Sequence, residues 1–194
     1  MQDIRGLRAG DPIGDKEVIG RRLAARPALV GAWDQIRQRL PFDLRDFEET
    51  RPPHDISLDW LGKSGLQKKV LRPLGNQATR MFGQQKPPQT FAGWVYLQTE
   101  KVSKAHRDFP CRVVSSPERP DEPDHPEHNP YHCLIKYEQP FSHPHLMAQH
   151  VYLQFQKKGT VEIHPRTPFY KVPYEFVRRV INALKPQRRP QRKG

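Results

Sequence analysis

The stretch HVYLQFQKKGTVEIH, residues 150–164, carries the pattern on which the predicted fold depends. Apolar residues alternate with polar ones on both sides of a glycine: Val151, Leu153 and Phe155 before it, Val161 and Ile163 after it. Gly159 supplies the positive φ that a three-residue turn requires. The stretch therefore predicts a β-hairpin in which Phe155 lies opposite Val161, because this register brings the two apolar faces together.

Three stretches upstream have the composition of strands, and they extend the predicted sheet. Residues 91–102, 111–115 and 131–138 contain aromatic and β-branched side chains in short runs. In the last of these stretches, Cys133 and Ile135 share one face. Together with the hairpin, the three stretches predict an antiparallel sheet of about five strands.

Apolar residues at helical spacing predict helices at both ends of the chain. Asp15 can cap a first helix over residues 16–25, and Pro27 suits the first turn of a second helix. The two elements form an N-terminal helical pair over 15–40, and a C-terminal helix is predicted over 173–184. Because 21 of the 194 residues are prolines, the connections are expected to be long, Pro-rich loops.

The fold class that these elements predict is α+β, in a single domain over residues 1–184. The chain is expected to comprise the helical pair (15–40), a basic loop segment (60–90), the sheet plus the C-terminal helix (91–184), and a disordered basic tail (185–194). The tail is expected to be disordered because it is too polar and too proline-rich to fold alone.

The net charge of +12, from 33 basic and 21 acidic residues, favours a phosphate-rich partner. No acidic residue lies between Asp59 and Glu100, and the last 20 residues carry seven basic residues and one acidic residue. Basic segments are also typical of flexible linkers and solubilising tails, so that interpretation stays open. The residues predicted to contact a phosphate backbone are Lys63, Lys68, Lys69, Arg72, Arg80, Lys86, Lys157, Lys158, Arg178, Arg179, Arg188, Arg189, Arg192 and Lys193.

The polar face of the predicted hairpin indicates an alternative function, that of a metal-independent, toxin-like endoribonuclease. In the expected register this face carries His150, Tyr152, Glu162 and His164 as candidate catalytic residues. Ribonuclease chemistry needs a base for the 2′-hydroxyl proton, an acid for the leaving oxygen and cations on the phosphate. The competing interpretation is a solvent-facing polar face, which half-buried antiparallel sheets commonly have.

Seven of the nine histidines lie between residues 106 and 150, together with both cysteines, and this clustering makes zinc a candidate cofactor. The candidate ligands are His125, His128, His132 and Cys133, whose nitrogen and sulfur donors suit tetrahedral zinc. However, adjacent residues of a strand point to opposite faces, and no paired CxxC or HExxH pattern fixes the ligands. A metal-dependent nicking site at His143-Pro144-His145 is a weaker alternative, because proline is a poor central-strand residue.

The function expected from the sequence is that of a basic nucleic-acid-binding protein that grips the phosphate backbone, favours RNA over DNA and requires no cofactor. The alternatives are a ribonuclease or other phosphodiesterase, and a zinc-containing or structural protein that binds partners in a nucleoprotein or phage-like assembly. No apolar run approaches the ~20 residues that span a bilayer, and the N-terminus has no apolar signal region. With only two cysteines, the expected location is the cytoplasm, with no membrane partner.

Overall fold

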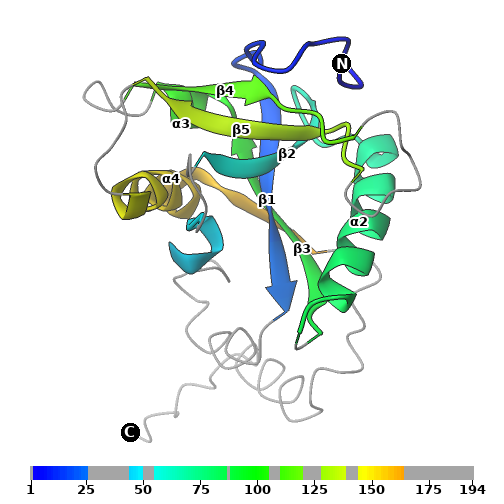
Figure 1. The fold of residues 1–194 in the computed structure, drawn as a ribbon. Coiled ribbons are helices and arrows are strands. Elements are labelled where there is room, and N and C mark those ends of the chain that lie inside the picture. The colour runs from blue at the N-terminus through cyan, green and yellow to red at the C-terminus, as the bar shows by residue number, and fades with distance from the viewer. Residues whose placement is uncertain are drawn as a thin grey trace, which may run out of the picture.

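The computed structural model describes residues 2–25, 44–49, 55–86, 88–104, 110–119, 128–138 and 144–163. Within them, six strands form one antiparallel sheet in the order β4-β5-β2-β1-β3-β6 (Figure 1). The strands are β1 (Glu17–Ala25), β2 (Ile56–Lys63), β3 (Thr90–Gln98), β4 (Cys111–Ser115), β5 (His132–Tyr137) and β6 (Thr160–Ile163). The helices are α2 (Lys68–Gly83), α3 (Glu100–Ser103) and α4 (Pro144–Lys158), with a short 3-10 helix, η2 (Leu44–Phe47). This architecture confirms the α+β class.

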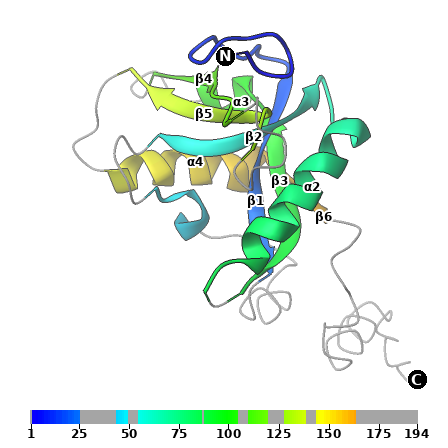
Figure 2. The ribbon, with the colours of Figure 1, turned by 45° about the vertical axis from the view of Figure 1, so that its right-hand side comes forward.

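Helices cover the two faces of the sheet (Figures 1 and 2). On one face, Phe82 of α2 stacks on Phe91 of β3, with ring centroids 5.9 Å apart. On the other face, Phe155 of α4 packs against Phe47 of η2 at 5.0 Å, and both side chains are fully buried. The central strands are therefore covered on both sides, and their side chains form the core.

Three of the predicted strands are confirmed. β4 coincides with the predicted stretch 111–115, and β5 lies within 131–138 with Cys133 and Ile135 fully buried, as expected. β3 ends at Gln98, four residues before the predicted end, because α3 begins there.

The predicted helix over residues 16–25 is wrong, because this segment is the strand β1. β1 lies between β2 and β3, and a strand buried on both faces does not show polar–apolar alternation. Register shifts between Val18 and Ile19 and between Leu23 and Ala24 place neighbouring apolar residues in the core, which produces a spacing close to that of a helix.

The predicted hairpin is also wrong, because its first arm belongs to the helix α4. Val151 and Phe155 are four residues apart, a spacing that fits both periodicities. Met147 and Ala148 are buried as well, and together with Val151 and Phe155 they show the three- and four-residue spacing that is typical of a helix. Gly159 follows the helix, and its N–H donates to the carbonyl of Phe155 at 2.8 Å.

The return strand of that hairpin does exist, but it pairs with a different partner. β6 lies antiparallel to β3, with Val161 opposite Val95 and not opposite Phe155.

A proline explains where α4 begins. Pro144 occupies the first helical position, where a residue without an N–H loses no hydrogen bond of the helix.

The basic loop segment predicted over 60–90 is wrong, because it contains the end of β2 and the whole of α2. Basic residues mixed with glycines predicted a loop, yet α2 contains Gly75 and also an exposed proline, Pro73. Val70, Leu74 and Ala78 recur every four residues and are buried, so packing of this stripe overrides the local preference.

Several predictions fall on parts of the chain that lie outside the described residues. These are the second helix of the N-terminal pair, the C-terminal helix over 173–184 and the basic tail over 185–194.

Candidate functional site

β1 and β2 pair along only part of their length, and a cavity opens where they separate. The ladder runs from Glu17–Lys63 to Gly20–Asp59. We call the region beyond it, between residues 21–25 and 56–58, the strand fork. A cavity of about 400 Å³ occupies the fork, and both strands, the C-terminal end of α2 and parts of 118–132 line it. This volume lies within the range of about 300–1,000 Å³ that small-molecule sites have.

Ser57 pairs with Leu134 of β5, and side chains replace its missing partner on the β1 side, in the fork. The N–H of Ser57 donates to Glu49 Oε1 at 3.2 Å, and the carbonyl of Ser57 accepts from Arg21 Nη1. Arg21 Nη1 also donates to the same Glu49 oxygen at 2.8 Å. The ion pair therefore satisfies two backbone groups that would otherwise be unpaired, and it fixes the position of Ser57.

Asp59 is the centre of a buried polar network behind the cavity. Its carboxylate accepts from Arg22 Nε at 2.6 Å, Arg22 Nη2 at 2.8 Å, Asn129 Nδ2 at 2.9 Å and Trp94 Nε1 at 3.2 Å. Burial alone would raise the pKa of Asp59, but the Arg22 guanidinium and these donated hydrogen bonds hold its pKa below the usual value. Asp59 is thus ionised and neutralises Arg22, linking β1, β2 and β3.

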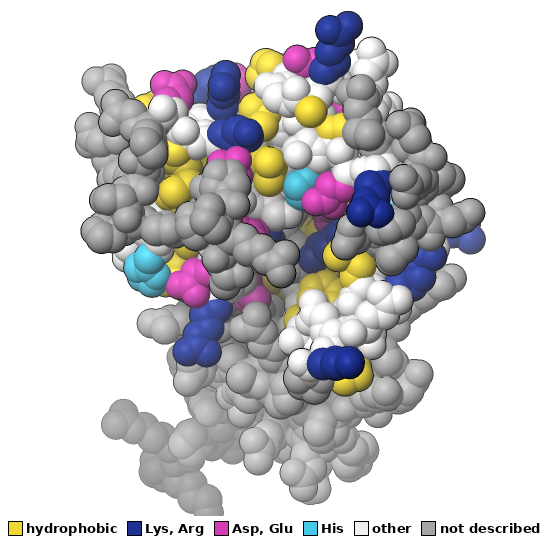
Figure 3. Space-filling model, viewed as in Figure 1, with side chains coloured by type: hydrophobic (Ala, Val, Ile, Leu, Met, Phe, Trp, Pro, Cys, Tyr) yellow, Lys and Arg dark blue, Asp and Glu magenta, His cyan; other side chains and the backbone are white. Residues whose placement is uncertain are grey.

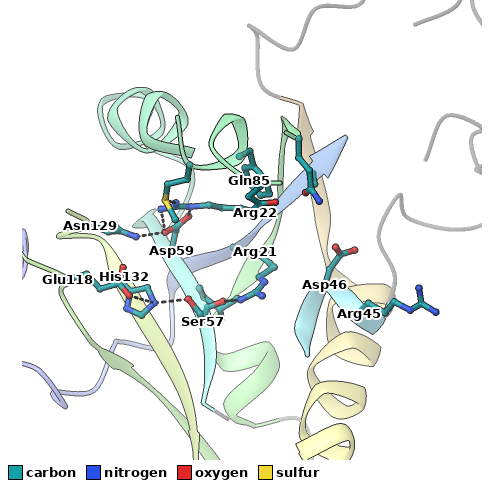
Figure 4. A pocket seen from close by; sticks show the side chains of 16 residues that line it. Arg21, Arg22, Arg45, Asp46, Ser57, Asp59, Gln85, Glu118, Asn129 and His132 are labelled. Carbon is teal, nitrogen blue, oxygen red and sulfur yellow. Dashed lines mark hydrogen bonds and ion pairs between the residues drawn. The ribbon is translucent and has the colours of Figure 1, made fainter. Parts of the chain in front are cut away.

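Ser57 and His132 form a hydrogen-bonded pair that faces the cavity (Figure 4). Ser57 Oγ lies 2.7 Å from His132 Nε2, and His132 Nδ1 lies 2.7 Å from the carbonyl oxygen of Ser116. A carbonyl oxygen can only accept, so Nδ1 carries the proton, and in the neutral ring Nε2 accepts from the Ser57 hydroxyl. Glu118 Oε1 lies 3.5 Å from Nε2, where it can stabilise a positive charge on the ring.

A second candidate surface lies on the outer side of α2. Lys68, Lys69, Arg72 and Arg80 are exposed, and we call these four residues the α2 basic face. At 3.6 residues per turn they lie within about a third of the helix circumference, opposite the buried stripe. The helix contains no acidic residue, and none of the four forms an ion pair with an acidic residue in the described part of the chain. Figure 3 shows Lys and Arg side chains along the side of the molecule that α2 occupies.

The structure brings Lys158 close to the loop that precedes α2. Lys158, at the end of α4, lines a shallow pocket of about 260 Å³ together with Lys101 and the turn residues Ser64 and Gly65. Lys63, Lys86 and Lys157 are exposed as well. Of the predicted phosphate-contacting residues, Arg178, Arg179, Arg188, Arg189, Arg192 and Lys193 lie outside the described residues.

The predicted catalytic residues do not share a strand face. His150 and Tyr152 lie on α4, where His150 Nδ1 contacts the hydroxyl of Tyr137 at 2.8 Å. Glu162 lies on β6, and His164 lies outside the described residues. The predicted acid–base arrangement on the hairpin is therefore wrong, because the segment that contains His150 and Tyr152 is a helix and not a strand.

The described members of the predicted zinc set also point apart. Cys133 is fully buried in the core, where burial raises its pKa, whereas His132 faces the cavity from the opposite side of β5. His128 Nδ1 contacts the carbonyl of Arg119, and His125 lies outside the described residues. In the described part of the chain, no three His, Cys, Asp or Glu side chains form a group that could hold a metal ion.

In comparisons with known proteins, no family model, no curated protein and no solved structure matches the chain. Among the residues that the structure describes, no helix is both long enough and apolar enough to cross a membrane. The features that bear on function are therefore the cavity in the strand fork and the α2 basic face.

Sequence reasoning missed Ser57, and it named His132 only as a candidate zinc ligand and not as the partner of a serine. A signal exists in the stretch ISLDW, residues 56–60, where Ser57 and Asp59 alternate with buried apolar residues. This alternation predicts a strand with a polar face. Residues 116–118 supply the Ser116 carbonyl and the Glu118 carboxylate that contact His132. No local sequence pattern predicts these contacts, because they depend on how the chain returns to β5 after β4.

Proposed function

We propose that this protein binds nucleic acid through the α2 basic face, with Lys63 and Lys86 extending the surface at the two ends of the helix. The observation that supports the proposal is that the four cations of this face are exposed and form no ion pair with a described acidic residue. Lys and Arg side chains in this state can neutralise phosphates and release the counterions that surround them.

The dimensions of the surface suit a phosphate backbone. Lys68 and Arg80 are twelve residues apart, which corresponds to about 18 Å along the helix axis. At 3.4 Å per base-pair step, this length covers roughly five steps of a duplex. A contact of this kind reads the backbone and not the bases, so we expect weak dependence on base sequence.

The proposal covers RNA first and DNA second, and a charge-reversal experiment tests it. Fluorescence anisotropy is measured with labelled 20-nucleotide RNA and DNA strands of mixed sequence at low salt. K69E/R72E should weaken binding at least tenfold, because it replaces two phosphate contacts with two repulsive charges. Both side chains are exposed, so the fold should be retained.

A matched control separates the α2 basic face from the effect of net charge. Arg8 and Arg112 are exposed and lie at the β4 edge of the sheet, away from α2, and R8E/R112E changes the net charge by the same amount. Binding should change much less in this control than in K69E/R72E. Equal loss of affinity in both variants, or no binding by the unmodified protein, would refute the proposal.

A further inference from the structure

We propose that Ser57 is an activated nucleophile, that His132 is its general base, and that the cavity in the strand fork binds a phosphodiester of nucleotide size. The inference goes beyond nucleic-acid binding, because it assigns a reaction to a second site. The first support is the pair itself: Ser57 Oγ and His132 Nε2 are 2.7 Å apart, which is hydrogen-bond reach for proton transfer.

The base is oriented by a third group, as nucleophile–base sites require. The carbonyl of Ser116 accepts from His132 Nδ1 and so fixes the tautomer that leaves Nε2 free to take the serine proton. Glu118 Oε1, at 3.5 Å from Nε2, stabilises the imidazolium ion that forms when the proton moves. His132 is almost completely buried, so its ring orientation is constrained.

The nucleophile is held as firmly as the base. Glu49 binds its backbone N–H and Arg21 binds its backbone carbonyl, so β2 cannot shift at Ser57 without breaking both contacts. A serine on an ordinary paired strand needs no such support. Placing the hydroxyl in a fixed geometry lowers the entropic cost of reaching the transition state.

Glu49 and Asp59 neutralise the charges of Arg21 and Arg22, but the arginine side chains still offer an N–H donor to a phosphate oxygen at the cavity. Arg21 and Arg22 both line the cavity, from the strand next to Ser57. Arg22 Nη1 donates to Met81 Sδ at 3.0 Å, and a thioether sulfur is a weak acceptor. A phosphate oxygen would be a better acceptor for this N–H, and it would gain stabilisation as negative charge develops in the transition state.

The remaining walls suit the rest of a nucleotide. Leu58, Met81 and Phe82 provide apolar surface, and Gln85 and Gln89 provide amide groups that can donate or accept. With a volume of about 400 Å³, the cavity has the size and mixed polarity of a small-molecule site.

The proposed reaction is the hydrolysis of a phosphodiester in two steps. In the first step, Ser57 Oγ bonds to phosphorus, the bond from phosphorus to the leaving oxygen breaks, and the serine proton passes through His132 Nε2 to the leaving alcohol. In the second step, water attacks phosphorus and the Ser57–phosphorus bond breaks. The water proton returns through His132 to Ser57, so the net reaction converts a diester and water into a monoester and an alcohol.

Labelling with an alkyl fluorophosphonate tests the nucleophile without knowledge of the natural substrate. Attack by Ser57 forms the oxygen–phosphorus bond and expels fluoride, and peptide mass spectrometry locates the adduct. We expect one adduct, at Ser57, and none in S57A. H132Q should label at least about 100-fold more slowly, because a positioned base contributes about 10²–10⁴ in rate.

A matched serine and an independent variant complete the test. S103A changes a serine on α3 that lies outside the cavity, and R8E/R112E changes two exposed arginines at the β4 edge of the sheet; both should label at the rate of the unmodified protein. Folding of every variant is checked by circular dichroism. Absence of an adduct at Ser57 in folded protein, or equal labelling rates in H132Q and the unmodified protein, would overturn the proposal.

Replacing the serine with a cysteine gives a second readout that does not depend on phosphorus chemistry. Burial raises the pKa of Cys111 to about 12 and raises that of Cys133 as well, so both native thiols should react slowly with iodoacetamide. S57C places a thiol beside His132, and S103C is the control. At pH 7, the thiol introduced by S57C should be alkylated at least tenfold faster than the thiol introduced by S103C, and equal rates would contradict activation by His132.

Discussion

The α2 basic face and the strand fork both contain several cations, but the cations are in opposite states. On α2, Lys69 and Arg72 project from an exposed helix face with no described acidic partner. In the fork, Arg21 binds Glu49 and Arg22 binds a buried carboxylate. The first set is available to a polyanion, whereas the second set shapes and stabilises a cavity. Net charge alone therefore does not show where a phosphate backbone binds.

The largest expected effect comes from removing the buried charge in the fork. D59N leaves the Arg22 guanidinium without its counter-ion in a largely buried position, and breaking such a pair costs about 3–5 kcal/mol of the free energy of unfolding. Urea denaturation at pH 7 measures this loss.

The control for D59N is an ion pair that is more exposed. Asp55 lies 3.4 Å from Lys136, whose side chain is 42% exposed. D55N should cost less than about 1 kcal/mol, because solvent screens pairs of this kind. If the two variants lose the same stability, the network around Asp59 does not have the role assigned to it.

A substitution of Gly20 tests how tightly the sheet is packed beside the fork. A Cβ at Gly20, in β1 beside the fork, would lie 2.6 Å from Leu61 Cδ1 and 3.0 Å from the carbonyl oxygen of Val95. G20A should therefore lower the free energy of unfolding by about 1–3 kcal/mol, as overpacking does. The midpoint of urea denaturation measures the change, and an unchanged midpoint would show that the centre of the sheet is more loosely packed than described.

Acid should weaken the fold through two buried carboxylates. The pKa of Asp59 and that of Asp3 are both lowered in the folded protein: burial alone would raise each, but Arg22 acts on Asp59, and Arg5 and Ser115 act on Asp3. A lowered folded pKa gives stability that is present above the unfolded value of about 3.9 and is lost as the pH falls through the folded pKa. The free energy of unfolding should decrease as the pH is lowered beyond about 4. In D59N this decrease with pH should be smaller. Thermal denaturation between pH 5 and pH 2 measures both curves, and parallel curves would contradict the assignment.

The smallest expected effect lies on α2. Gly83 is exposed in the last turn of the helix, and a Cβ there would meet nothing within 4 Å. G83A should raise the free energy of unfolding by about 0.5 kcal/mol, because alanine loses less conformational freedom in a helix than glycine does. Calorimetry would detect the higher melting temperature, and a lower one would indicate a contact at Gly83 that this structure does not contain.

The sequence predicted the strands with a single buried face better than the other elements. β5 has one clear apolar face and was predicted within a residue of its ends. β1 was not predicted, because both of its faces are buried and its register shifts disturb the pattern. α4 was assigned to a strand because Val151 and Phe155 fit either periodicity. The buried residues Met147 and Ala148 extend the pattern to the three- and four-residue spacing of a helix.

The charge pattern identifies the basic segment in the sequence, but it does not predict that this segment is a helix. The acid-free interval contains the basic residues of α2, and the helical conformation places four of them on one side. The cavity was beyond prediction, because it depends on where β1 and β2 separate. The His132 and Ser57 side chains come from strands 75 positions apart in the chain.

The measurement that tests the central claim most directly is the salt dependence of RNA binding in three proteins: the unmodified chain, K69A/R72A and R8A/R112A. For single strands, the slope of log K against log salt changes by about 0.7 for each phosphate that the protein no longer neutralises. With two phosphates fewer, the slope should become shallower by about 1.4 in K69A/R72A and stay unchanged in R8A/R112A. A slope that is equal in all three proteins, or that changes only in R8A/R112A, would contradict the assignment of the α2 basic face as the nucleic-acid surface.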